Sequence, residues 1–138
     1  MIVVDTNVVA YLLIPGEHTA FARATLARDA EWVAPTLWRS EFRNVLALYM
    51  REGELTLAQA AALQDAAEEL LAGREQTVAS NEVLELAQTS RRSAYDCEFV
   101  AVARRLRLPL VTSDRSLRAS FAHDTVSLQQ FGAEATGS

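Results

Sequence analysis

Four acidic residues stand at positions where a charged side chain is costly unless something neutralises it. Asp5 and Asp114 each follow a short apolar run, Asp96 opens an amphipathic segment, and Glu41 lies within an apolar stripe. Holding unpaired carboxylates together in a partly buried place costs several kcal/mol. Carboxylate oxygens are the ligands that Mg²⁺ and Mn²⁺ prefer, and such ions activate water for attack on a phosphate ester. The four residues therefore predict a metal site and hydrolysis of a phosphate ester.

Three of these acids also have a purely structural explanation. Asp5 and Asp114 each precede a segment of helical character, and aspartate is a favoured N-cap residue because its carboxylate accepts backbone N–H bonds. Asp96 stands near the start of a helix, where a negative charge complements the helix dipole. Taken one at a time, these three residues are better explained by capping than by catalysis.

Glu41 is harder to explain without a ligand. It is expected in the interior of a helix, where it cannot cap, so its burial requires a cationic partner such as Arg39 or Arg104. Glu98 is a fifth candidate acid. On an ideal helix it lies about 200° from Asp96, so the two cannot point squarely at one ion.

Short apolar segments alternate with helical patterns along the chain. Strands are expected at 2–4, 31–34, 76–79, 110–112 and 125–128, and helices at 6–14, 19–29, 36–52, 56–72, 80–89, 95–107 and 115–121. This alternation indicates a parallel sheet covered by helices on both faces. Ligands of such sheets bind beyond the carboxyl ends of the strands, so we expect Asp5 and Asp114 at one rim. We expect one domain over residues 1–128 and a flexible tail over residues 129–138.

Charge and cysteine content set further bounds. Thirteen basic residues against eighteen acidic ones give a net charge of −5, and every basic residue is arginine. Setting the four acids aside leaves thirteen against fourteen, so overall charge neither supports nor excludes RNA as a partner. The single Cys97 cannot form an internal disulfide, and with two histidines in the chain a structural zinc site is not expected. We expect Cys97 to be a small buried residue.

The sequence has no apolar run long enough to cross a membrane and no basic leader before an apolar stretch. The expectation is a cytoplasmic protein without membrane attachment.

The acids and the segments around them resemble the PIN-domain ribonucleases, and within these the VapC-type toxins of bacterial toxin–antitoxin pairs. The matching segments, in order, are Ile2-Val3-Val4-Asp5-Thr6-Asn7, Ser40-Glu41 with Asn44, Tyr95-Asp96-Cys97-Glu98-Phe99-Val100-Ala101-Val102-Ala103, and Leu110-Val111-Thr112-Ser113-Asp114. The resemblance covers residues 1 to about 128.

The resemblance implies a three-layer sandwich with a central, mostly parallel sheet of four or five strands. It implies Mg²⁺ or Mn²⁺ held by Asp5, Glu41, Asp96 and Asp114, with Glu98 as a further candidate ligand. Supporting roles fall to Thr6, Asn7, Asn44 and Thr112. The implied reaction is endonucleolytic hydrolysis of RNA by a metal-activated water. The implied partners are a cognate antitoxin and a second copy of the chain in a homodimer.

Contacts to RNA phosphates must come from neutral and cationic groups near the acids. The candidates by sequence proximity are Arg39, Arg43, Arg115 and Arg118. Each is equally explained by surface solvation or an ion pair.

Other functions remain open. A phosphoacceptor domain also uses acids at strand ends, but it needs an acidic pair and a lysine, and this chain has no lysine. A non-catalytic protein-binding module would need only caps and ion pairs, which Glu41 in its apolar stripe opposes. A housekeeping PIN nuclease of RNA processing is the nearest alternative, and an adjacent antitoxin gene would argue against it.

Overall fold

The computed structural model describes residues 1–136, and its centre is a sheet of five strands. The strands are β1 (Ile2–Val4), β2 (Trp32–Pro35), β3 (Glu75–Gln76), β4 (Leu110–Thr112) and β5 (Thr125–Ser127). Their order across the sheet is β3-β2-β1-β4-β5, and each neighbouring pair is parallel. The expected parallel sheet is confirmed, with five strands.

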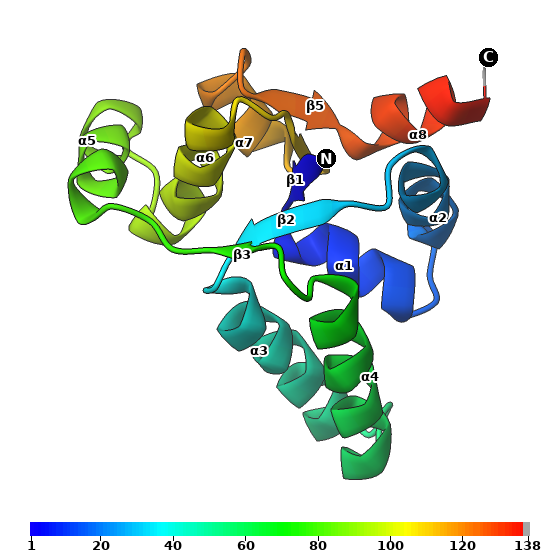
Figure 1. Cartoon of the computed structure of the whole chain (residues 1–138). Coiled ribbons are helices and arrows are strands. Elements are labelled where there is room, and N and C mark those ends of the chain that lie inside the picture. Colours follow the sequence, from blue (N-terminus) through cyan, green and yellow to red (C-terminus); the bar gives the residue numbers. More distant parts are fainter. Residues whose placement is uncertain (137–138) are drawn as a thin grey trace.

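Helices cover both faces of this sheet. They are α1 (Thr6–Leu13), α2 (Thr19–Arg28), α3 (Trp38–Arg51), α4 (Leu57–Leu70), α5 (Ser80–Ser90), α6 (Ala94–Leu106), α7 (Arg115–Ser120) and α8 (Leu128–Thr136). α6 packs on β1, β2 and β4 with α5 against its outer side, whereas α1 lies on the other side together with α3 and α4 (Figure 1). Right-handed crossovers produce this division, because the chain moves toward β3 first and returns to β4 later.

The core is made by the strands and the helix faces turned toward them. β1, β2 and β4 are buried along their whole length, as expected for central strands of a parallel sheet. Trp32, Trp38 and Phe42 are the bulkiest of the fully enclosed side chains. Because β1 lies in the middle, the residue that follows it is fixed against a rigid layer.

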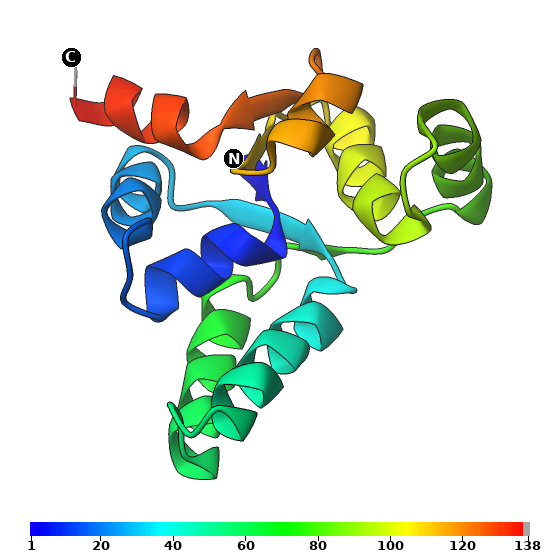
Figure 2. The ribbon, with the colours of Figure 1, turned by 180° about the vertical axis from the view of Figure 1, so that it is seen from behind.

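α3 and α4 form a hairpin that projects from the body of the molecule, as the view from behind also shows (Figure 2). Gly53 adopts φ 76° in the turn, a left-handed conformation that glycine allows. Thr56 and Gln59 form a capping box at the start of α4. At the base of the hairpin, Arg39 binds Glu75 and Glu68, which ties α3 to β3 and α4.

α3 begins at Trp38, two residues later than the sequence pattern predicted. The backbone N–H of Thr36 donates to the carbonyl of Gln76 at 3.1 Å, which extends the β2–β3 ladder past Pro35. Strand pairing therefore holds the residues that were expected in the first helical turn. As a result Glu41 lies in the first turn of α3, so its expected place in the helix interior is wrong.

The segment 129–138, which was expected to be a flexible tail, is helical over most of its length. Residues Leu128–Thr136 form α8, which packs along α2, while residues 137 and 138 lie outside the described part of the chain. Leu128 and Phe131 are buried, and the Arg28 guanidinium lies 4.0 Å from the centre of the Phe131 ring. The helix packs through these two buried apolar residues, and Phe131 meets α2 in a contact between distant stretches of the chain.

Within residues 1–136, none of the helices combines the length and the hydropathy that crossing a membrane would require.

Candidate active site

The site lies at β1, where the order in which the chain adds strands to the sheet reverses. β1 connects onward to β2 on one side, yet it also pairs with β4 on the other, with Val4 opposite Val111. Such a switch point, beyond the carboxyl ends of the strands, is where open α/β sheets bind ligands. Asp5 follows β1 and Asp114 follows β4, so the two carboxylates come to the same rim, as predicted.

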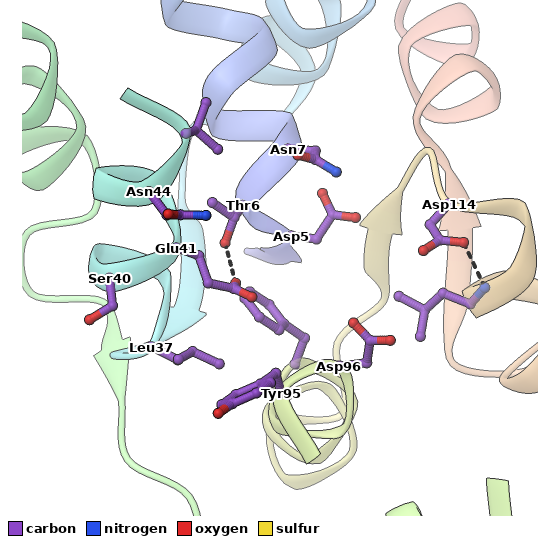
Figure 3. Close-up of a pocket in the computed structure, with 13 residues that line it drawn as sticks. Asp5, Thr6, Asn7, Leu37, Ser40, Glu41, Asn44, Tyr95, Asp96 and Asp114 are labelled. Atoms are coloured by element: carbon purple, nitrogen blue, oxygen red, sulfur yellow. Dashed lines mark hydrogen bonds between the residues drawn. The ribbon is translucent and has the colours of Figure 1, made fainter. Parts of the chain in front are cut away.

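A pocket of about 460 Å³ opens at this rim, and all four predicted acids line it (Figure 3). Asp5 comes from the end of β1, Glu41 from α3, Asp96 from α6 and Asp114 from the start of α7. The remaining lining residues are Thr6, Asn7, Leu37, Ser40, Asn44, Val45, Tyr95, Phe99 and Leu117. Segments far apart in the sequence thus contribute acids to one cavity.

The capping explanation also holds for three of these acids. Asp5 accepts a hydrogen bond from the backbone N–H of Val8, and Asp114 accepts one from Leu117. Asp96 lies in the first turn of α6, where its charge complements the helix dipole. The caps fix one oxygen of Asp5 and one of Asp114, which makes the side chains rigid without removing them from the pocket.

Two threonines hold the acids from behind. Thr6 donates its hydroxyl hydrogen to Oε1 of Glu41 at 2.7 Å. Thr112 is fully buried and donates its hydroxyl hydrogen to Oδ2 of Asp5, while its oxygen accepts the N–H of Asp114 at 3.0 Å. The supporting position predicted for both threonines agrees with these bonds.

Burial and mutual repulsion raise the pKa values of the acids at the centre of the site. Burial raises the pKa of Asp5 to about 6, against the lowering effect of the bonds from Thr112 and Val8, and the charges of Asp114 and Glu41 raise it further. Burial likewise raises the pKa of Glu41, which the Thr6 bond lowers and the charge of Asp96 raises. The ionised forms of these carboxylates are therefore less favourable here than in water, and an approaching cation would stabilise them.

No arginine within residues 1–136 neutralises Glu41 or Asp5 through a salt bridge. The two partners considered for Glu41 are engaged elsewhere: Arg39 binds Glu75 and Glu68, and Arg104 binds Asp124 at 3.0 Å. Neither arginine is therefore available to explain the burial of Glu41 as a simple ion pair. Its carboxylate remains in the pocket with the Thr6 hydroxyl as its bonded neighbour.

The other predicted residues divide into two groups. Asn7 and Asn44 line the pocket as expected. Glu98 does not line it, although its charge contributes to raising the pKa of Glu41. Arg39 is bound at the base of the hairpin and Arg118 lines a separate cavity near β5 and α8, so their placement does not support contact with a phosphate in this pocket.

Arg43 and Arg115 are exposed near the site but do not line the pocket. Phosphate contact by these two residues stays a prediction.

Sequence reasoning missed Arg92, which lies between α5 and α6. Its Nη2 lies 3.1 Å from Oδ2 of Asp96 and 3.5 Å from Oδ2 of Asp114, and its Nη1 donates to Oγ of Ser116 at 2.6 Å. The side chain is only 15% exposed. Arg92 lies between the end of α5 and the N-cap Ser93 of α6, outside both helices, so no helical spacing pattern pointed to its contact with Asp96.

Tyr95 is a second residue whose place the sequence did not reveal. Both Tyr95 and Phe99 line the pocket, but Phe99 is buried whereas Tyr95 is 62% exposed. An exposed aromatic ring beside an acidic pocket is suited to stack on a base.

Cys97 is buried, as expected. Burial raises the pKa of its thiol, which opposes a nucleophilic role.

Comparison with known proteins identifies the family. Residues 2–120 match the PIN domain family, and the chain belongs to it. PIN domains are in general nucleases. No curated protein matches the chain.

Solved structures share the fold at low sequence identity. PAE2754 from Pyrobaculum aerophilum is 20% identical, with 99% of this chain and 96% of that chain covered and a TM-score of 0.77. FitAcB from Neisseria gonorrhoeae is 20% identical over 93% and 98% of the two chains, with a TM-score of 0.70. A structure of FitAB bound to an IR36 DNA fragment is 19% identical over 94% and 96%, with a TM-score of 0.73.

The pocket suits a divalent metal by the chemistry of its donors. Its four carboxylates are hard oxygen ligands, and Asp5 and Glu41 lack a cationic partner within the described residues. As the side chains stand, no three acidic, histidine or cysteine residues within residues 1–136 are gathered as a ready ion site. Binding an ion therefore requires at least one carboxylate to turn from its present position.

Proposed function

We propose that this chain is a Mg²⁺- or Mn²⁺-dependent endoribonuclease and the toxin of a type II toxin–antitoxin pair. The observation that carries the proposal is the convergence of Asp5, Glu41, Asp96 and Asp114 on one pocket at the switch point of the sheet. Membership of the PIN family supports the nuclease part. The resemblance of the acid-containing segments to VapC-type toxins supports the toxin part.

Asp5, Glu41, Asp96 and Asp114 would hold the metal. When bound, it supplies a water of lowered pKa as nucleophile and positive charge beside the scissile phosphate. The carboxylates of Asp5 and Asp114 are held by backbone N–H groups, so they are in place before an ion arrives. Glu41 reaches the pocket from α3 and is oriented by Thr6.

The substrate would be held by neutral groups around the acids. The side-chain amides of Asn7 and Asn44 line the pocket and can donate hydrogen bonds to phosphate oxygens. The Tyr95 ring at the edge of the pocket offers a surface on which an unpaired base can stack. Arg43 and Arg115 are exposed cations near the site and complete the proposed RNA surface.

The partners we propose are an antitoxin that binds over the acidic pocket and a second copy of the chain in a homodimer. Both come from the resemblance to VapC-type toxins. Co-expression with the product of an adjacent small gene would test the first, and light scattering of the purified chain would test the second.

Cleavage of RNA tests the enzymatic part directly. Purified protein is incubated with single-stranded RNA and with DNA of the same sequence, in Mg²⁺, in Mn²⁺ and in EDTA. We expect cleavage of RNA with either metal, none in EDTA, and none by Asp96→Asn. Asp65→Asn, an exposed aspartate on α4, is the matched control and should cleave normally. Cleavage that persists in EDTA or in Asp96→Asn would overturn the proposal.

The toxin part needs a separate experiment. We expect growth arrest and RNA fragments on expression of the wild-type chain, and neither with Asp5→Ala. Normal growth despite active, folded enzyme would favour a housekeeping role in RNA processing.

A further inference from the structure

Arg92 divides the acidic pocket into two unequal halves. Asp5 and Glu41 form an open half, whose bonded partners are backbone N–H and threonine hydroxyl groups. Asp96 and Asp114 form a closed half, since both carboxylates share the guanidinium of Arg92. The chain thus supplies a permanent positive charge to one side of its own acidic site.

The bridge is made by a single nitrogen. Nη2 of Arg92 lies 3.1 Å from one oxygen of Asp96 and 3.5 Å from one oxygen of Asp114. A divalent ion that joined the same two oxygens would need bonds of about 2.0–2.2 Å to each, in the same space. A guanidinium nitrogen and a bridging ion cannot occupy that space together.

The arrangement is too well anchored to be an incidental surface pair. The guanidinium contacts two separate elements, α6 through Asp96 and the start of α7 through Asp114 and Ser116. Its Nε is buried and has no hydrogen-bond partner within residues 1–136, so this donor is left unsatisfied while the other two nitrogens are engaged. A buried donor without a partner costs free energy, which a solvated arginine on the surface does not lose.

Charge balance points the same way. Four ionised carboxylates carry four negative charges, which Arg92 reduces to three, and one divalent ion then leaves a single negative charge. A second divalent ion would make the site net positive. Asp5 and Glu41 of the open half remain free to bind an ion. Asp96 can add its Oδ1, because Arg92 engages only Oδ2.

We propose that Arg92 takes the place of a second metal ion, so that each chain binds one divalent cation, at Asp5, Glu41 and Asp96, while Asp114, the fourth acid of the proposed site, is held by Arg92 instead. Arg92 is then a positioning residue, which fixes Asp96 and Asp114 and neutralises the closed half. This inference rests on the proposed metal-dependent function and specifies how many ions that function uses.

Counting bound Mn²⁺ tests the inference without reference to activity. Free Mn²⁺ is measured by electron paramagnetic resonance while the folded, metal-stripped protein is titrated. We expect one Mn²⁺ per wild-type chain and two per chain of Arg92→Gln, which removes the charge but keeps a polar side chain. Arg91→Gln, an exposed neighbour with the same change in net charge, should bind one.

Arg92→Lys adds a second comparison, because it retains the positive charge and should also bind one ion. Two ions on the wild-type chain overturn the role of Arg92 even if RNA cleavage is intact. A single ion on folded Arg92→Gln, with unchanged affinity, overturns it as well. Absence of Mn²⁺ binding by every variant would instead remove the metal-dependent function on which the inference rests.

Discussion

Thr6 and Glu41, 35 residues apart, are joined by a hydrogen bond of 2.7 Å between the hydroxyl of the first and Oε1 of the second. The bond connects the first turn of α1 to the first turn of α3, on the side of the pocket opposite Asp114 (Figure 3). It gives a partly buried carboxylate one donor without giving it a counter-charge. The Asp5 and Glu41 side of the pocket keeps its negative character because its supports are neutral.

Replacing Thr6 with valine should destabilise the metal-free protein. Thr6 is 7% exposed, and valine has nearly the same shape but cannot donate to Glu41. Loss of a hydrogen bond to a charged acceptor costs about 1–3 kcal/mol in the free energy of unfolding. Urea denaturation at pH 7 in EDTA measures this, with Thr6→Ser, which keeps the hydroxyl, as the control. Equal stability of the valine and serine variants would show that the bond contributes nothing.

The stability of the metal-free protein should fall as pH rises, and Asp5 should contribute to the fall. Because its pKa is raised from 3.8 to about 6, the folded state binds this proton more tightly than the unfolded chain does. The contribution is fully present below about pH 4 and is lost as pH rises through 6. Between pH 5 and pH 7 the loss is on the order of 1 kcal/mol.

Asp5→Asn tests this directly, because asparagine has no proton to lose in this range. Denaturation in EDTA at several pH values should give a flatter dependence for Asp5→Asn than for the wild type. Parallel curves for the two proteins would exclude the raised pKa. Asp65→Asn, which alters an exposed aspartate, should follow the wild-type curve.

Tyr95 should contribute to RNA binding through its ring. Stacking of a base on an aromatic side chain is worth about 1–3 kcal/mol by alanine substitution, which is roughly tenfold or more in affinity. In an inactive Asp5→Asn background, Tyr95→Ala should raise the Kd for single-stranded RNA by about tenfold, measured by fluorescence anisotropy. Tyr95→Phe keeps the ring and should bind normally. If alanine and phenylalanine bind alike, the base does not stack there.

Truncating Phe131 should destabilise the whole domain and not only its end. Phe131 lies on α8, is 6% exposed and contacts α2. Truncation of a buried phenylalanine costs about 3–5 kcal/mol in the free energy of unfolding. Thermal or urea denaturation of Phe131→Ala should show one cooperative transition at lower stability. Leu84→Ala, at a position 61% exposed on α5, is the matched control and should change little. A stability of Phe131→Ala near that of the wild type would show that α8 is dispensable.

Local signals in the sequence predicted the sheet and the acids of its rim. Short runs such as Ile2–Val4 are apolar throughout because central parallel strands are buried on both faces. Asp5 and Asp114 were recognisable because each comes just beyond such a run. Glu41 was noticed for its place in an apolar stripe, although the start of its helix was predicted two residues too early.

Features that depend on contacts between distant segments were not predictable. The start of α3 is set by a backbone bond from Thr36 to Gln76, which no helical pattern reveals. α8 is held by α2 through a few apolar residues in a polar segment. The contact of Arg92 with Asp114 depends on the loop before α6 lying close to the start of α7. Each of these needs the three-dimensional arrangement before its meaning is visible.

The central place of β1 in the sheet has a consequence for how the protein is made. β2 ends at Pro35 and β4 ends at Thr112, so β1 meets its second neighbour only after more than a hundred further residues have been made. Pairings between such remote segments form late, because a long loop must close first. Asp5 and Asp114 therefore meet only after β4 has been made, and a nascent chain that stops before β4 cannot assemble the full set of pocket acids.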